Sequence, residues 1–382
     1  MKTPTIFREK STFAPSLPRG ATYVAAGVLA VAGVVFAAHR EGGAVRVIAE
    51  SQATAATSGP ASSREGDVVR AGGRANQHDR VGKSPWGKDD QIGTLNMMTD
   101  QTRLRVLERV ASGKAYDLSV EYYVGMPSWY AVGDPRYQYH LTHTPEGTVV
   151  TDPLGVGRAM NEKVSYTGDA VTMYTHMGTH IDALNHFGLH GEIWNGIAAH
   201  EHLGDKGWSK AGAEVLPPIV ARGVLIDVAA SKGLAELPSS YRIMPEDLKQ
   251  ALARQKTRIE PGDVVLVRTG RMRQFYRDNT SYMDNPPGLG LAAARWLIEE
   301  AGAMTLGADN LSLETFPVET EDNWIPVHTY LLAERGVPFM EVVNLEGLAS
   351  DGVYTFAFMA ASLKLRGASG APLRPLAFPL RG

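Results

Sequence analysis

The chain of 382 residues contains no cysteine. This absence excludes disulfide bonds, a cysteine nucleophile and thiolate ligands for a metal. Any bound metal must therefore be held by imidazole nitrogens and carboxylate oxygens, a set of donors that suits zinc, manganese or iron better than softer ions. The same absence excludes a lipid anchor attached through cysteine.

The chain also lacks an excess of basic residues. Its 38 Lys and Arg residues face 41 Asp and Glu residues, giving a net charge of -3, so no positive field is available to attract nucleic acid. The sequence contains no Walker loop and no G-x-S-x-G nucleophile elbow. These absences argue against a P-loop nucleotide-binding enzyme and against a serine enzyme of the α/β-hydrolase type. A hydrophobic content of 44% and a charged content of 21% are ordinary for a soluble globular body. We therefore expect a small-molecule partner and no nucleic acid.

The amino terminus is a separate element. Residues 1–20 form a short basic segment, and residues 21–38 form an apolar run of 18 residues without a charge, which is at the short end of what spans a bilayer. The positive-inside rule places the rest of the chain on the extracytoplasmic side. We interpret residues 21–38 as a hydrophobic helix that anchors the chain in a membrane, or as a signal peptide that is removed. A buried Ala/Val core helix is the alternative. The protein is thus expected to be membrane-anchored or exported.

Residues 39–84 are predicted to form a flexible linker. From residue 51 onward this segment is rich in Ser, Ala, Gly and Arg and contains few large apolar residues. It cannot bury enough surface to offset the entropy lost on ordering. The folded body is therefore predicted to cover residues 85–382.

Short apolar runs alternate with helical patterns along this body. Val220–Val228, Asp263–Thr269 and Tyr354–Ala360 predict strands. Pro245–Leu252 predicts a helix, with proline early and acidic residues in its first turn, and Pro287–Ala301 predicts a second helix. The alternation predicts an α/β domain with a mixed sheet.

One stretch places three histidines and a carboxylate within eleven residues: His176-Met-Gly-Thr-His180-Ile-Asp182-Ala-Leu-Asn-His186. Six of the eleven histidines of the chain lie between His176 and His202. His176, His180 and Asp182 are standard ligand types for a divalent metal, and His186 is left over as a proton carrier. The alternative is a set of polar residues on a wet strand face. The pattern favours a metal-dependent hydrolase.

These ligands can meet only if the chain bends. Even-numbered positions share one side of a strand, but six residues of extended chain span about 20 Å, which is too far for one ion. Gly178 is the residue that permits a bend. We therefore expect a strand end that turns into a loop.

The other histidines are weaker candidates. His200-Glu-His202 has the H-x-H pattern but no carboxylate at a matching spacing, so a surface or hydrogen-bonding role is favoured there and at His190. His140 and His143 have no partner pattern, which leaves them as residues that could line a pocket.

The stretch from His176 to His186 resembles the H-x-G-T-H-x-D-x-P-x-H motif of the cyclase family of metal-dependent hydrolases, to which kynurenine formamidase and isatin hydrolase belong. The resemblance covers roughly residues 85 to 380. It includes the segments Trp86–Asn96, Gly262–Gly270, His328–Leu345 and Leu363–Pro375.

The resemblance implies a swivelling β/β/α-type single domain with a mixed central sheet, which often forms homo-oligomers. It implies that His176, His180 and Asp182 hold a first metal and that His186 transfers protons. It also implies that Asp182 could bridge to a second metal held with His328 and Glu341. Members of the family use one or two ions, which are zinc or manganese. A weaker match suggests that Trp129 contacts the substrate.

One departure from the motif is clear, because Leu184 stands where the family has proline. Proline would fix φ and stiffen the approach to His186. The segment from Gly188 to Pro218, with Trp194 and Trp208, is also richer in insertions than in small members of the family.

The expected reaction is hydrolysis of a C–N amide bond in a cyclic amide, a lactam or an aryl formamide. A metal lowers the pKa of water from about 15.7 towards 7, and histidine can carry a proton at neutral pH. Three alternatives remain open: a lactone or ester hydrolase, a dehydratase or cyclisation enzyme, and a non-enzymatic membrane-tethered protein that binds a metal or ligand.

Overall fold

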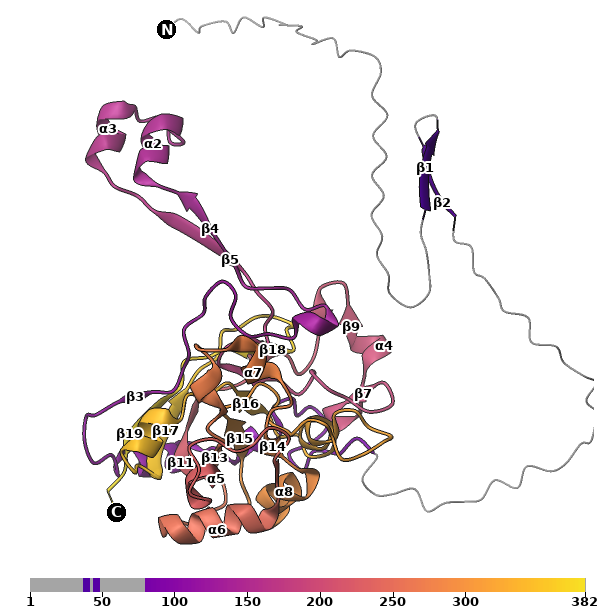
Figure 1. The fold of residues 1–382 in the computed structure, drawn as a ribbon, viewed down its shortest axis with the longest axis vertical. Helices are drawn as coiled ribbons and strands as arrows, with labels where there is room; N and C mark the ends of the chain where they lie inside the picture. The colour runs from indigo at the N-terminus through magenta and orange to yellow at the C-terminus, as the bar shows by residue number, and fades with distance from the viewer. Residues whose placement is uncertain (1–36, 42–43, 49–79, 382) are drawn as a thin grey trace, which may run out of the picture. The chain divides into compact units, whose positions relative to one another are not determined.

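A computed structural model describes residues 37–41, 44–48 and 80–381 (Figure 1). The chain divides into two units, Met1–Ala71 and Gly72–Gly382. In the first unit, β1 (Ala37–Glu41) and β2 (Ala44–Ile48) pair as an antiparallel hairpin. Ala37 and Ala38 of the apolar run thus belong to β1, and the rest of that run lies outside the described residues. Within the described ranges no helix is long and apolar enough to cross a membrane. The anchor or signal peptide and the linker remain predictions.

A curled, nine-stranded mixed sheet forms the centre of the second unit (Figure 1). Its strand order is β18-β6-β16-β15-β13-β11-β17-β19-β3. The strands β16, β15, β13 and β11 run parallel to one another, and the outer pairs are antiparallel. In chain order the strands are β3 (Tyr116–Asp117), β6 (His180–Asp182), β11 (Ile219–Asp227), β13 (Val264–Arg268), β15 (Thr305–Ala308), β16 (Phe339–Glu341), β17 (Thr355–Ala360), β18 (Gly370–Pro372) and β19 (Leu376–Pro379).

The central strands are apolar on both faces because both faces of the sheet are covered. In β13, Val265 and Val267 enter one core, while Val264 and Leu266 enter the core on the opposite side. Parallel strands that are buried on both faces are expected to be continuously hydrophobic. This explains why β13 reads as an unbroken apolar run in the sequence.

Short helices surround the sheet. The longest, α6, begins with Pro245 at its first position, and the Asp247 carboxylate accepts a hydrogen bond from the Met244 N–H before it. Leu248 and Leu252 of α6 pack into the first core. The α-helices are α1 (Asp100–Leu107), α2 (Pro145–Thr151), α3 (Arg158–Lys163), α4 (Ala199–His202), α5 (Val228–Ser231), α6 (Pro245–Gln255), α7 (Asn279–Met283), α8 (Leu291–Arg295), α9 (Pro326–His328) and α10 (Glu346–Ser350). Single turns of 3-10 helix are η1 (Gly93–Met97), η2 (Tyr130–Val132), η3 (Trp194–Gly196), η4 (Ala213–Val215) and η5 (Arg271–Gln274), and the π-helical turns are η6 (Trp296–Glu300) and η7 (Thr329–Glu334).

Several strand pairs lie outside the main sheet. The largest is the antiparallel ribbon of β4 (Gln138–His143) and β5 (Gly168–Thr172), which carries α2 and α3 away from the body (Figure 1). The other pairs are β7 (Glu192–Ile193) with β8 (Ile197–Ala198), β9 (Leu203–Gly204) with β10 (Gly207–Trp208), and β12 (Arg242–Ile243) with β14 (Gly288–Leu289).

Most of the expected elements of the body are confirmed. The predicted α/β fold with a mixed sheet is present, and β11, β13, β17 and α6 lie where the apolar runs and the early proline place them. The helix expected over Pro287–Ala301 is wrong at its start. Gly288 and Leu289 form β14, and the Leu289 N–H donates to the Leu313 carbonyl, so a tertiary backbone contact replaces the first helical turn.

Candidate metal centre

The chain turns sharply just before the first candidate ligands. After β5 ends at Thr172, a turn leads into β6, and Gly178 adopts a left-handed φ of 58°. A Cβ at Gly178 would lie 2.6 Å from the Tyr122 ring, so only glycine fits there. The predicted bend at Gly178 is confirmed, and β5 ends in the turn as expected, while His180 and Asp182 lie on a further strand, β6, after the turn. The turn allows His176 to fold back over β6.

Strand pairing explains how two of the ligands meet a third one that is distant in sequence. His180 and Asp182 lie two residues apart on β6 and therefore share one side of the strand. Glu341 lies directly opposite His180 on the antiparallel neighbour β16. All three side chains are buried. The register of two strands thus places an imidazole and two carboxylates at one point on the sheet.

Two groups of ligand-type atoms meet in this place. His176, His180 and Asp182 form the first group, and Asp182, His328 and Glu341 form the second, with the atoms of each group within 4.8 Å of one another. In the first group, Asp182 Oδ1 lies 2.6 Å from His176 Nδ1 and 3.3 Å from His180 Nε2.

The second group depends on His328, at the end of α9. Its Nε2 lies 3.4 Å from Glu341 Oε1 and 3.9 Å from Asp182 Oδ2. Asp182 therefore belongs to both groups, as the family resemblance implies for a bridging carboxylate. The structure brings together all five residues expected to hold metal, and their roles as ligands remain predictions.

The donor atoms fit a divalent cation. His180 Nδ1 is 2.8 Å from the Gly178 carbonyl, so it donates there and leaves Nε2 facing the two carboxylates. His180 Nε2, Asp182 Oδ2 and Glu341 Oε1 are buried without a hydrogen-bond partner in the described part of the chain. Buried polar atoms normally have partners, and convergent imidazole and carboxylate donors suit zinc or manganese.

Sequence reasoning missed Glu314, which orients His328. Its carboxylate accepts hydrogen bonds from the backbone N–H groups of Val327 and His328, and it lies 2.6 Å from His328 Nδ1. A histidine that donates through one nitrogen to a carboxylate presents the other nitrogen to a metal in a fixed orientation. Glu314 lies in a loop after β15, and no motif in the sequence marks it.

Replacing Glu314 by glutamine should lower metal affinity by about 10- to 100-fold, because the variant loses the charge that orients His328. Competition titration with a metal indicator measures this affinity. Glu319→Gln is the matched control, since Glu319 accepts a hydrogen bond from the Leu291 N–H, pairs with Arg242 and belongs to neither ligand group. Equal affinities in the two variants would remove Glu314 from the site.

The surroundings of the centre shift the pKa values of its ionisable groups in different directions. Burial alone would raise the pKa of Asp182, but His186 and His176 outweigh it and hold that pKa well below its usual range. Burial opposes charge on His328, yet Glu314 and Glu341 raise the pKa of its ring to about 10. The carboxylates of Glu314 and Glu341 thus stabilise a positive charge at His328. A bound metal ion would supply such a charge.

His186 differs from its neighbours. Its ring stacks on that of His176, with centroids 3.7 Å apart and planes inclined by 19°, and its Nε2 lies 3.8 Å from Asp182 Oδ2. Burial and the adjacent His176 ring hold the pKa of His186 well below its usual value. The ring is therefore neutral at pH 7 and can accept a proton at the edge of the centre.

An aromatic cavity of about 260 Å³ opens onto these residues. Trp129, whose ring is 5.9 Å from that of Phe316, stands in its wall, and its contact with a substrate stays a prediction. The other aromatic walls were not identified from sequence. The aromatic residues of the wall are Trp129, Tyr174, Phe187, Phe316 and Trp324.

The remaining histidine candidates lie elsewhere. His200 and His202 are on α4 beside Glu201, and the His200 side chain is 81% exposed. His140 and His143 are on the β4–β5 ribbon, and neither lines the aromatic cavity. The surface role favoured for the H-x-H pair therefore agrees with its position.

The departure from the motif has a packing consequence. Leu184 is fully buried and belongs to the first core, where Trp194 also packs. The loop is held by hydrogen bonds from the Ala183 N–H to the Ser369 carbonyl and from the His186 N–H to the Ala183 carbonyl. Hydrophobic anchoring and these two bonds hold the approach to His186 where proline would stiffen it.

Comparison with known proteins agrees with this architecture. The family model described as putative cyclase matches residues 116–315. Cyclase-like protein 2 of Arabidopsis thaliana is 26% identical over 281 residues, which cover 72% of this chain and 83% of that protein. Cyclase-like protein 3 of Oryza sativa subsp. japonica is 25% identical over 269 residues, covering 70% and 80%.

Solved structures share the fold. A crystal structure described as a novel cyclase is 29% identical, with a TM-score of 0.68, and the match covers 77% of this chain and 95% of that one. Isatin hydrolase A from Ralstonia solanacearum is 20% identical, with a TM-score of 0.52 and coverage of 69% and 91%; this likeness concerns the fold alone. From the family match and the arrangement of the motif residues, the chain belongs to the putative cyclase family.

Proposed function

We propose that this protein is a divalent-metal-dependent hydrolase that opens a C–N amide bond of a small cyclic amide, lactam or aryl formamide. One observation carries the proposal: two buried groups of ligand-type atoms share Asp182 and lie beside His186 at an aromatic cavity. A purely binding protein has no need of this proton carrier. Two of the solved structures with the same fold are named isatin hydrolases, which supports a hydrolytic reaction.

The residues of the centre divide the chemical work. His176, His180, Asp182, His328 and Glu341 would hold one or two ions of zinc or manganese, which supply a water of lowered pKa and polarise a carbonyl when bound. Asp182 is the side chain through which both groups are tied together.

His186 acts on the proton. Its ring is unprotonated at neutral pH, so its free nitrogen can take a proton from the attacking water and return it to the leaving atom. A nitrogen leaving group requires this protonation more than an oxygen does. The requirement favours amides over lactones and esters.

The cavity limits the substrate. Its volume of about 260 Å³ is near the lower end for ligand pockets, and its walls are mainly aromatic. The described residues that line it include Asp134 and Glu341 but no lysine or arginine. We therefore propose a small, flat substrate that is neutral where it enters the cavity.

A substrate panel tests the proposal. The protein is purified, stripped of metal with a chelator and reloaded with zinc or manganese, and hydrolysis of matched lactams, aryl formamides and lactones is followed by product mass. We expect metal-dependent gain of one water, fastest for the amides. Faster turnover of lactones would favour the ester alternative, and loss of water would favour a dehydratase. Metal binding without turnover across the panel would contradict the assignment as an enzyme.

The low pKa of His186 sets the expected pH dependence. The reaction needs the neutral ring, and a bound cation would lower its pKa further. The part of the acid limb of kcat/KM that depends on His186 should therefore lie below pH 6.5, the ordinary pKa of histidine, whereas protonation of a metal-activated water would act nearer pH 7. The pH–rate profiles of the wild type and His186→Gln separate the two, and a limb above pH 6.5 that disappears in the variant would contradict a neutral His186.

A further inference from the structure

A second cavity adjoins the catalytic one. Its volume is about 450 Å³, and it is lined by residues 187–190, residues 322–325 and Thr329; we call it the outer chamber. Phe187, Trp324 and Ile325 line both the outer chamber and the catalytic cavity. These three side chains therefore form the partition between the two spaces.

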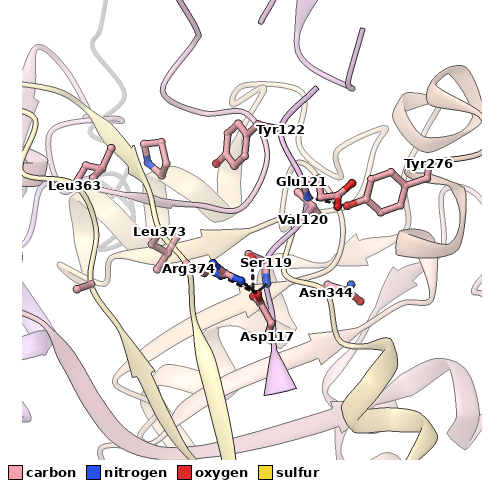
Figure 2. A pocket seen from close by; sticks show the side chains of 12 residues that line it. Asp117, Ser119, Val120, Glu121, Tyr122, Tyr276, Asn344, Leu363, Leu373 and Arg374 are labelled. Atoms are coloured by element: carbon pink, nitrogen blue, oxygen red, sulfur yellow. Dashed lines mark hydrogen bonds and ion pairs between the residues drawn. The ribbon is translucent and has the colours of Figure 1, made fainter. Parts of the chain in front are cut away.

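A larger open groove of the second unit is separate from this pair of cavities. It has a volume of about 910 Å³ and lies beside β3 (Figure 2). None of the described residues that line the groove also lines the catalytic cavity or the outer chamber. Its Arg374 is already bonded to Asp117 (Figure 2). The outer chamber, and not this groove, thus extends the space beside the metal centre.

The partition has a fixed part and a part that can turn. Ile325 is buried. The centroid of the Phe187 ring is 4.4 Å from that of His186 and 5.1 Å from that of His328. Trp324 is 70% exposed, and its ring meets the Phe187 ring edge-on at 5.5 Å. Exposed side chains change rotamer within nanoseconds, so a turn of the Trp324 indole joins the two spaces.

The backbone on both sides of the outer chamber is held by hydrogen bonds. Asn323 Nδ2 donates to Thr329 Oγ1, and Asn323 Oδ1 accepts from the Ile325 N–H. On the other side, Leu189 and Glu192 exchange two backbone hydrogen bonds, which close a tight turn. The chamber is therefore preformed, and opening the partition requires no movement of the main chain.

The volumes indicate that a substrate reaches beyond the catalytic cavity. Ligand pockets usually measure about 300–1,000 Å³, whereas the catalytic cavity has about 260 Å³. The catalytic cavity and the outer chamber together fall within that usual range. A flat ring seated beside His186 therefore leaves room for a substituent on the far side of the partition.

The side chains of the outer chamber set the chemistry of this substituent. Phe187, Leu189 and Trp324 give the chamber apolar walls. Its ionisable side chains are His190 and Asp322, and no lysine or arginine of the described chain lines it. A carboxylate accepts hydrogen bonds and repels an anion. A chain of methylene groups that ends in an N–H or O–H donor therefore fits the chamber, and one that ends in a carboxylate does not.

We propose that the outer chamber is a second subsite for the substrate. This inference rests on the proposed function, because the ring that bears the substituent is the one whose C–N bond lies at the metal centre. The ring occupies the catalytic cavity, the substituent passes Trp324, and its donor end meets Asp322. The substrate class is then a cyclic or aryl amide with a linear apolar substituent that ends in an amine or a hydroxyl group.

Titration calorimetry tests the subsite with the metal-loaded full chain in mild detergent. The probes are cyclic aryl ketones in which a methylene replaces the amide nitrogen, so that no C–N bond can open. They carry no substituent, or a butyl chain ending in an amine, a hydroxyl or a carboxylate, at each ring position in turn. Measurements at pH 8 lie above the titration range of an ordinary histidine.

In the best ring position, the amine and hydroxyl probes should bind at least about 10-fold more tightly than the unsubstituted ketone, since the chain buries methylene groups. The carboxylate probe should bind at least about 3-fold more weakly than the amine probe, a difference that suits an exposed charge. Equal affinities of the substituted and unsubstituted ketones at every ring position would overturn the subsite.

Replacing Asp322 by asparagine isolates the contact at the end of the substituent. The difference between the amine and carboxylate probes should disappear, while the gain from the methylene chain persists. Glu321→Gln is the matched control, because Glu321 is the neighbouring carboxylate and lines neither cavity. It should keep the difference. An unchanged difference in Asp322→Asn, or the same loss in both variants, would remove Asp322 from the subsite.

Protection of a single thiol locates the substituent. The chain has no cysteine, so Leu189→Cys places one thiol in the wall of the outer chamber. The amine probe should slow alkylation of this thiol by iodoacetamide, and the unsubstituted ketone should not. Leu104→Cys, at an exposed position of α1, should show no protection. Binding of the amine probe without protection in Leu189→Cys would exclude the outer chamber as the place of the substituent.

Turnover of the matching amides distinguishes this inference from the proposed function. Hydrolysis that shows no preference for the substituent would leave the hydrolase standing and overturn the subsite. Tight binding of the substituted ketones, with protection in Leu189→Cys but no hydrolysis of any amide, would support the subsite and contradict the hydrolase.

Discussion

Replacing Asp182 by alanine is expected to abolish metal binding and, with it, activity. Asp182 is the one residue that both ligand groups contain, so its loss removes an oxygen donor from each. The same carboxylate lies 2.6 Å from His176 Nδ1 and holds the first group together. Elemental analysis of the purified variant, together with turnover on the best substrate of the panel, measures the effect. We expect metal at background level and no detectable turnover.

Variants on either side of Asp182 make this result specific. His176→Ala touches the first group and His328→Ala touches the second. If two ions bind, each of these variants should keep one ion per chain while Asp182→Ala keeps none. If one ion binds, only one of the two should lose it. Full metal content in a folded Asp182→Ala variant, as judged by circular dichroism, would contradict the shared ligand.

The half of the centre that lies within one short stretch of chain could be predicted from sequence. His176, His180 and Asp182 are close in the chain, and elementary strand geometry requires a bend, which Gly178 supplies with its positive φ. The other half could not be derived in this way. Glu341 meets His180 through the register of β6 with β16, two strands that lie about 160 residues apart in sequence, and only the family resemblance indicated it.

The residues that support the centre and line the cavity could not be predicted from the sequence, for a different reason. Glu314 acts through its contacts with His328 and two backbone N–H groups, and a lone glutamate in a loop has no pattern. The aromatic walls Phe187 and Trp324 likewise come from separate loops. Binding residues often lie on loops, which show no periodic pattern in the sequence. The reactive centre could therefore be predicted in part from the sequence, whereas the walls of the cavity could not.

Replacing His186 by alanine should lower kcat by about 10²- to 10⁴-fold while metal content stays unchanged. The ring lies at the cavity, 3.8 Å from Asp182, and is outside both ligand groups, so its loss removes proton transfer without removing a ligand. Steady-state kinetics and elemental analysis on the same sample measure both quantities.

A matched substitution and a rescue experiment separate proton transfer from damage to the fold. His200→Ala removes an exposed histidine that does not line the cavity and should leave kcat unchanged. Added imidazole should partly restore His186→Ala, because the truncated side chain leaves space next to His176 for a free base. Rescue should rise with pH as the fraction of neutral imidazole grows, with a midpoint near its solution pKa. Wild-type turnover in His186→Ala, or loss of its metal, would exclude the proposed role, since a group outside the ligand set that moves a proton must change rate and leave binding intact.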